Sequence, residues 1–195
     1  MKKIVVIVIV LISNLSTSQT INIKNKNGTR IDGAYYKDVD FELNQFEGTY
    51  QYLANNGDDN LTIVFKKIED YYNGKFYQDL LVGEVKLRKD GIDYYDNLNK
   101  ITIAYNTPFK HEIVGNTLMA NQTRPTCDDC LPNQYRARVM FFGRDNNCGG
   151  YIILQKFIEN NIEKIKASFF FNCSYQPHNL EPILTGGDYI LTRIN

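Results

Sequence analysis

The chain has 195 residues, with 22 basic and 22 acidic side chains, so its formal net charge at pH 7 is zero. This balance disfavours general binding to nucleic acid or to anionic membranes, because both require a concentrated positive field. The 14 tyrosines and 11 phenylalanines, with no tryptophan, suit half-buried pleated strands.

The first eighteen residues have the order of charge, apolar core and small polar residues that is typical of a secretory signal peptide. Lys2 and Lys3 precede the apolar run 4–12, which spans about 14 Å as a helix, roughly half of a bilayer core. We therefore expect cleavage after Ser18 and a soluble product in the periplasm or outside the cell, without membrane insertion. The alternative is a buried N-terminal strand of a cytosolic domain.

Residues 19–34 are polar and contain Asn27-Gly28 and Gly33, which predicts a flexible leader. No internal repeat or linker follows, so residues 35–195 are expected to form a single β domain.

Short alternating segments separated by turn residues dominate the rest of the chain, and residues 66–78 leave room for one short helical turn. Without longer helices between them, such segments indicate an all-β fold, either an antiparallel barrel or a strongly curved sandwich. The predicted strands are Glu47–Leu53, Leu61–Phe65, Asp79–Arg88, Ile92–Tyr95, Lys100–Ala104, His111–Met119, Tyr135–Phe142, Gly150–Ile158, Ile162–Asn172 and Asp188–Ile194.

The hairpin around Asn160-Asn161 has a predictable register. A two-residue loop there pairs Glu159 with Ile162, because asparagine tolerates the positive φ of such turns. The same register places Cys148 opposite Cys173, where cross-strand sulfurs can approach closely.

Four cysteines in an exported chain predict two disulfides. We favour Cys148–Cys173 and Cys127–Cys130, although pairing of Cys130 with Cys148 is also open. A redox-active dithiol or a zinc site at Cys127 and Cys130 is a further alternative. Two carboxylates between these sulfurs oppose thiolate formation, and a zinc site usually needs a second short-spaced pair. No metal and no cofactor are expected.

Neither histidine lies in a recognisable catalytic motif. His111 stands at a predicted strand start and His178 in a predicted loop, so both are expected to be structural, and no catalytic residue is assigned.

The aromatic side chains are the remaining functional signal. Tyr50, Tyr52, Tyr94 and Phe141 are candidate ligand-binding residues, because aromatic side chains line cavities and form binding surfaces. The alternative is that they are core and edge residues of a β protein.

Residues 46–50, Phe-Glu-Gly-Thr-Tyr, with the strand 61–67 and the Asp-Leu-Leu-Val-Gly-Glu segment 79–84, resemble a family of secreted or lipid-anchored proteins of Bacteroidota. That family has no assigned activity, so the resemblance implies none. The Gly-Thr-Tyr opening and the strand 189–193 also resemble lipocalin-type barrels, whose first and last strands pair, although the usual tryptophan is absent.

These observations favour an exported, non-enzymatic binding module for a small apolar ligand, a glycan or an envelope partner. The alternatives are a hydrolase of envelope polymers and a structural envelope protein. A tyrosine-lined cavity of roughly several hundred Å³ would favour binding of a ligand. A cleft that holds two converging carboxylates, or His111 or His178 beside one, would favour the enzyme, and a solid core would favour the structural protein.

Overall fold

A computed structural model describes residues 19–25, 28–54, 58–143, 148–173 and 186–194. The predicted signal peptide, residues 1–18, and His178 lie outside the described residues. The same holds for the side chains of Cys148 and Cys173, whose backbones belong to described strands.

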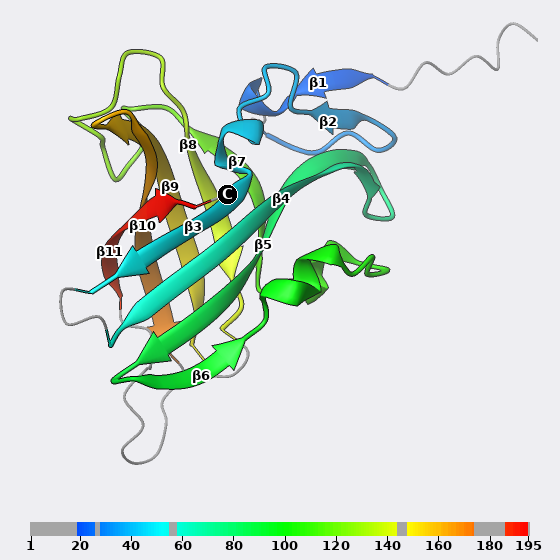
Figure 1. The fold of residues 1–195 in the computed structure, drawn as a ribbon. Coiled ribbons are helices and arrows are strands. Elements are labelled where there is room, and N and C mark those ends of the chain that lie inside the picture. The colour runs from blue at the N-terminus through cyan, green and yellow to red at the C-terminus, as the bar shows by residue number, and fades with distance from the viewer. Residues whose placement is uncertain (1–18, 26–27, 55–57, 144–147, 174–185, 195) are drawn as a thin grey trace, which may run out of the picture.

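Eight antiparallel strands close into a barrel, which confirms the predicted fold class. Each barrel strand pairs with the next along the chain, β5 pairs with β7, and β11 pairs with β3 to close the ring (Figure 1). The first and last barrel strands therefore pair, as the resemblance to lipocalins implies. The strands are β3 (Gly48–Leu53), β4 (Asn60–Tyr72), β5 (Tyr77–Lys89), β7 (Ile113–Met119), β8 (Arg136–Phe141), β9 (Cys148–Glu159), β10 (Ile162–Cys173) and β11 (Gly187–Arg193).

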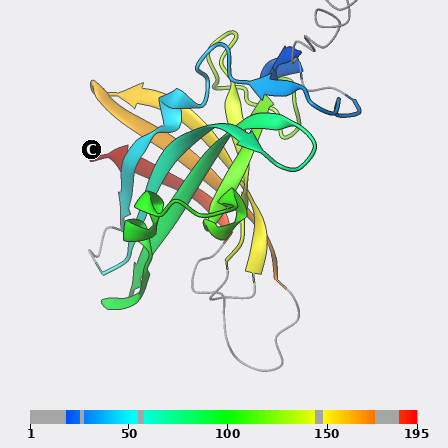
Figure 2. The same cartoon turned by 90° about the vertical axis from the view of Figure 1, so that its right-hand side faces the viewer.

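Three further strands extend β5 on the outside of the barrel. β6 (Ile92–Asp96) forms a hairpin with one end of β5, while β2 (Tyr35–Lys37) pairs parallel with its other end and also carries β1 (Thr20–Asn22). Both views place β1 and β2 at one end of the barrel, here called the upper end, and the β5–β6 hairpin at the opposite end (Figures 1 and 2). Helical structure in the described residues is limited to the 3-10 turns η1 (Ile23–Asn25), η2 (Asn44–Phe46), η3 (Leu98–Thr102) and η4 (Pro108–Lys110).

Aromatic and branched side chains fill the barrel interior. Alternation along each strand sends every second side chain inward, and the rings of Phe141 and Phe169 meet edge to face with centroids 6.0 Å apart. Tyr50 packs on Phe65 in the same manner at 6.3 Å. The other buried members of this core include Leu61, Ile63, Leu81, Val85, Ile113, Val139, Ile152, Leu154, Ile165, Ala167 and Leu191.

The β9–β10 hairpin has the predicted register. Asn160 and Asn161 both have positive φ, 53° and 62°, as a two-residue type I′ turn requires. Glu159 pairs with Ile162, and the ladder continues without a shift until Cys148 lies opposite Cys173. The predicted disulfide between these two residues remains a prediction.

Two predictions about local structure were wrong. Residues 100–104 do not form a strand: the chain turns through η3 and crosses the outer face, where Ile101 packs on Leu80 and Val82. A strand there would need a free neighbour, but Leu81 and Val82 of β5 already pair with β4 on one side and with β7 on the other. Residues 66–78 contain no helical turn, because β4 and β5 pair as far as Tyr72 and Tyr77.

The described parts of 19–34 differ from the expected flexible leader, since Ile23 and Ala34 are buried in the core. Within the described residues no helix has both the length and the apolar character that crossing a membrane requires.

A buried charge cluster joins these N-terminal elements to the upper end of the barrel. Lys67 Nζ lies 3.4 Å from Asp38 Oδ2 and 3.9 Å from Asp79 Oδ2. Asp79 also accepts hydrogen bonds from the Tyr35 hydroxyl at 2.5 Å and the Asp38 backbone N–H at 2.8 Å. Because all three charged side chains are buried, their mutual contacts must offset the cost of removing them from water.

Candidate binding site

The four aromatic residues singled out from the sequence do not form one site. Tyr50 and Phe141 are buried in the barrel core, and Tyr52 packs at its border against Tyr189, with ring centroids 5.2 Å apart. Tyr94 is exposed on β6, outside the barrel wall. The interior is thus occupied by the protein's own rings, and a candidate site has to be sought on the outer surface.

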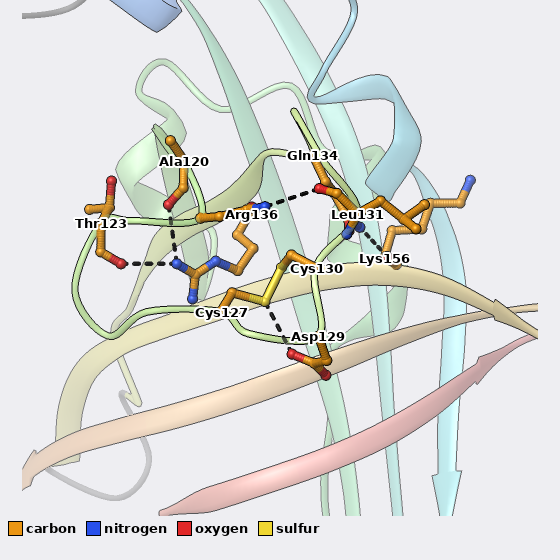
Figure 3. Close-up of a disulfide and its surroundings, with 10 residues drawn as sticks. Ala120, Thr123, Cys127, Asp129, Cys130, Leu131, Gln134, Arg136 and Lys156 are labelled. Carbon is orange, nitrogen blue, oxygen red and sulfur yellow. Dashed lines mark hydrogen bonds between the residues drawn. A yellow bond between two sulfur atoms is a disulfide. The ribbon is translucent and has the colours of Figure 1, made fainter.

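The segment between β7 and β8, residues 120–135, lies over the outer wall of the barrel and is here called the disulfide loop (Figure 3). Cys127 and Cys130 are disulfide-bonded within it, as predicted. Arg136 fixes one arm by donating to the carbonyls of Ala120, at 3.3 Å, and Thr123, at 3.0 Å.

The opposite arm of the disulfide loop is tied to the barrel wall by the Gln134 amide, which donates to the Lys156 carbonyl (Figure 3). The disulfide loop is therefore bound to the barrel at both ends and cross-linked by a disulfide bond between them, which gives it a defined shape.

A hollow of about 210 Å³ lies between the disulfide loop and the outward side chains of β8–β11, and is here called the polar hollow. Two cations, Arg136 and Lys166, and two carboxylates, Asp129 and Asp188, face it, so it favours neither charge. The other lining residues are Pro125, Thr126, Cys127, Ile153, Gln155, Ser168 and Phe170.

One buried polar atom at the polar hollow lacks a protein partner. Arg136 is only 4% exposed, and its Nε has no hydrogen-bond partner among the described residues. Gln155, which is 8% exposed, lines the same hollow. Burial lowers the pKa of the Arg136 guanidinium, while the Asp129 carboxylate acts in the opposite direction. An unpaired buried polar group costs free energy, so Arg136 Nε calls for a partner from outside the chain.

A row of three apolar side chains on the outer wall reaches the polar hollow at one end, through Phe170. Met140, Tyr151 and Phe170 lie directly opposite one another on β8, β9 and β10. The rings of Tyr151 and Phe170 are stacked, with centroids 4.8 Å apart and planes 14° apart, and Phe170 remains 39% exposed. These stacked rings, here called the aromatic platform, thus place an exposed Phe170 in the same hollow as the unpaired Arg136 Nε.

One of the two acidic side chains at the polar hollow, Asp188, is poorly suited to act as a catalytic acid. A hydrogen bond from Ser168 and an ion pair with Lys166, at 3.1 Å, hold the pKa of Asp188 below its usual range. A glycosidase acid needs a raised pKa instead, so that it carries a proton at the working pH. Asp188 therefore suits an acceptor of hydrogen bonds better than a proton donor.

His111 does lie beside a carboxylate, but away from the cavities of the outer wall. Its Nδ1 is 2.7 Å from Glu84 Oε1, and both side chains are buried beneath the η3–η4 segment. The neighbouring Glu112 accepts from the Val85 backbone N–H and the Asn97 amide. Neither His111 nor Glu84 lines the polar hollow, and a structural role for His111 stays a prediction.

The disulfide loop also holds the one group of metal-ligating side chains found in the described residues, Cys127, Asp129 and Cys130. Because the two sulfurs are bonded to each other, they offer no thiolate to a zinc ion.

Replacing Cys127 and Cys130 together with serine is expected to lower the free energy of unfolding by about 2 kcal/mol or less. The bridge joins residues only three apart, so it removes little chain entropy from the unfolded state. Urea denaturation measures the change. A loss above roughly 4 kcal/mol would contradict this prediction, because the bridge would then support the whole barrel.

The fold and the hollow together define a closed antiparallel β-barrel protein with a packed interior and a candidate site on its outer wall. The chain belongs to a family of unknown function (DUF6705), whose sequence profile matches residues 1–193. Neither the curated proteins nor the solved structures contain a match to it.

Proposed function

We propose that this chain is an exported, non-enzymatic binding protein whose ligand is a glycan held in the polar hollow. The observation that carries the proposal is the buried, unpartnered Arg136 Nε, which lies in the same hollow as the Gln155 side chain and the exposed ring of Phe170. Export is supported by the signal-peptide pattern of residues 1–18 and by the disulfide, which persists in oxidising compartments.

The chemistry of the polar hollow fits a neutral ligand with many hydroxyl groups. Guanidinium and ammonium groups donate hydrogen bonds, carboxylates accept them, and the amide of Gln155 does both. A hydroxyl group also donates and accepts, so a sugar can satisfy several of these groups together. The ring of Phe170, which stacks on Tyr151 and lines the polar hollow, offers an apolar surface for the less polar face of a sugar ring.

Other ligand classes fit less well. A lipocalin-type ligand would occupy the barrel interior, which Phe141, Phe169 and their neighbours fill in the described structure. A strongly charged ligand would meet a carboxylate or a cation of its own sign in the polar hollow. The lowered pKa of Asp188 favours binding over hydrolysis.

A glycan array followed by calorimetry tests the proposal. We expect Gln155→Leu and Phe170→Ala each to weaken binding of an array-selected glycan by about tenfold, because each removes one contact worth roughly 1.4 kcal/mol. The matched control is Tyr94→Ala, which removes an exposed aromatic side chain from β6 and should leave the affinity unchanged. Failure of every glycan to bind, or equal affinities for all variants, would refute the proposal.

A further inference from the structure

A second and larger hollow lies beside the polar one. Its volume is about 430 Å³, and it opens between the disulfide loop and the upper end of β9. Apolar side chains of both segments, Leu131, Phe157 and Ile158, line it, and we call it the apolar hollow. The remaining lining residues are Gln45, Asp129, Gln134, Gln155 and Lys156.

The apolar hollow contains the two most exposed large hydrophobic side chains of the described residues. Leu131 is 70% exposed and Ile158 is 67% exposed. Isolated exposed apolar residues are ordinary, but two such residues in one concavity indicate a surface that receives an apolar partner. Lys156, the one cation lining it, is paired with Glu163 at 2.8 Å, so the hollow does not present an unpaired positive charge.

The two hollows are neighbours that share two lining residues. Asp129, on the bridged part of the disulfide loop, and Gln155, facing outward from β9, line both of them. Successive outward side chains of a strand are about 7 Å apart. Ile153 in the polar hollow, Gln155 in both and Phe157 in the apolar hollow therefore mark a short path along one strand.

We propose that the ligand is an amphiphile, a glycan that carries an alkyl or acyl chain. The sugar lies in the polar hollow against Phe170, and the chain passes Gln155 into the apolar hollow between Leu131 and Ile158. This inference rests on the proposed function, since it assigns the glycan to the polar hollow. It adds that the natural ligand carries an apolar chain, and that residues of the disulfide loop line both the sugar-binding hollow and the hollow that takes the chain.

The test compares methyl and octyl β-glycosides of glucose, galactose, N-acetylglucosamine and maltose, titrated below their micellar concentrations. For the wild-type chain we expect the octyl form of a bound sugar to bind at least tenfold more tightly than the methyl form, because the chain removes apolar surface from water. Ile158→Ser should reduce this ratio at least threefold. The matched control is Ile92→Ser, which makes the same substitution at an exposed site on β6 and should not change the ratio.

The outcomes separate the two proposals. Equal affinities for methyl and octyl forms, or a ratio that Ile158→Ser leaves intact, would overturn the amphiphile while the glycan site stands. Octyl glycosides that bind with no effect of Gln155→Leu or Phe170→Ala would overturn the glycan site, and the amphiphile assignment with it. Absence of binding by every octyl glycoside would likewise overturn the amphiphile. Circular dichroism of each variant confirms that the barrel has folded.

Discussion

Replacing Asp79 with alanine is expected to lower the free energy of unfolding by about 3–5 kcal/mol, because it leaves buried groups without their partner. Asp79 is fully buried and accepts hydrogen bonds from the Tyr35 hydroxyl and from the backbone N–H groups of Asp38 and Asp70, at 2.5, 2.8 and 3.1 Å. It also faces Lys67, whose ammonium group would lose one of its two buried carboxylates.

The phenol of Tyr35 is a stable hydrogen-bond donor to Asp79 in this buried cluster. Burial, and then the hydrogen bond to Asp79, raise its pKa, so it stays a neutral donor to the carboxylate at ordinary pH.

The control for this prediction is Asp93→Ala. Asp93 is mostly exposed and reaches Arg88 only at 3.9 Å, so its loss should change stability by about 1 kcal/mol at most. Urea denaturation followed by far-ultraviolet circular dichroism compares the two variants. Similar losses for both would mean that apolar contacts alone hold the N-terminal elements to the barrel.

Replacing Gly150 with alanine is expected to cost about 3 kcal/mol or more. A Cβ at this position would stand 2.0 Å from the Phe170 carbonyl oxygen and 3.0 Å from the Phe171 Cα, so the backbones of β9 and β10 would have to separate. The same pair of strands carries Tyr151 and Phe170, so we expect the aromatic platform to be disturbed as well.

The preceding residue provides a matched control. A Cβ on Gly149 would meet no atom closer than the Phe141 carbonyl oxygen at 3.5 Å, an ordinary contact. Gly149→Ala should therefore alter the midpoint of thermal unfolding by only a few degrees, while Gly150→Ala lowers it by about 10 °C or prevents folding. If both variants melted together, the close approach of β9 and β10 would be disproved.

Local patterns in the sequence were sufficient to predict most of the barrel strands. Positive φ at Asn160 and Asn161 set the β9–β10 register, and alternation correctly placed Tyr50 and Tyr52 on the same face. The N-terminal elements and the segment 97–112 were not predictable in this way. Their short 3-10 turns depend on contacts with distant residues, as when Ile23 is buried in the barrel core.

The candidate site was only partly encoded in such patterns. The register that turns Phe169 and Phe171 inward also turns Phe170 outward, so the aromatic platform could have been deduced from the hairpin. The two hollows could not be deduced from the sequence, because Asp129 and Leu131 reach β9 from a loop about 25 residues earlier in the chain. A short cysteine spacing predicts a disulfide bond, but it does not predict which strands of the barrel the bridged loop will cover.

Closure of the barrel depends on a contact between two strands far apart in sequence. Gln51 of β3 meets Thr192 of β11, so the wall stays open until residues 187–193 are in place. A protease that cut before Gly187 would leave β3 and β10 as two long unpaired edges, and such edges recruit strands from other molecules. Pairing of β11 with β3 and β10 therefore protects this chain from aggregation through its strand edges.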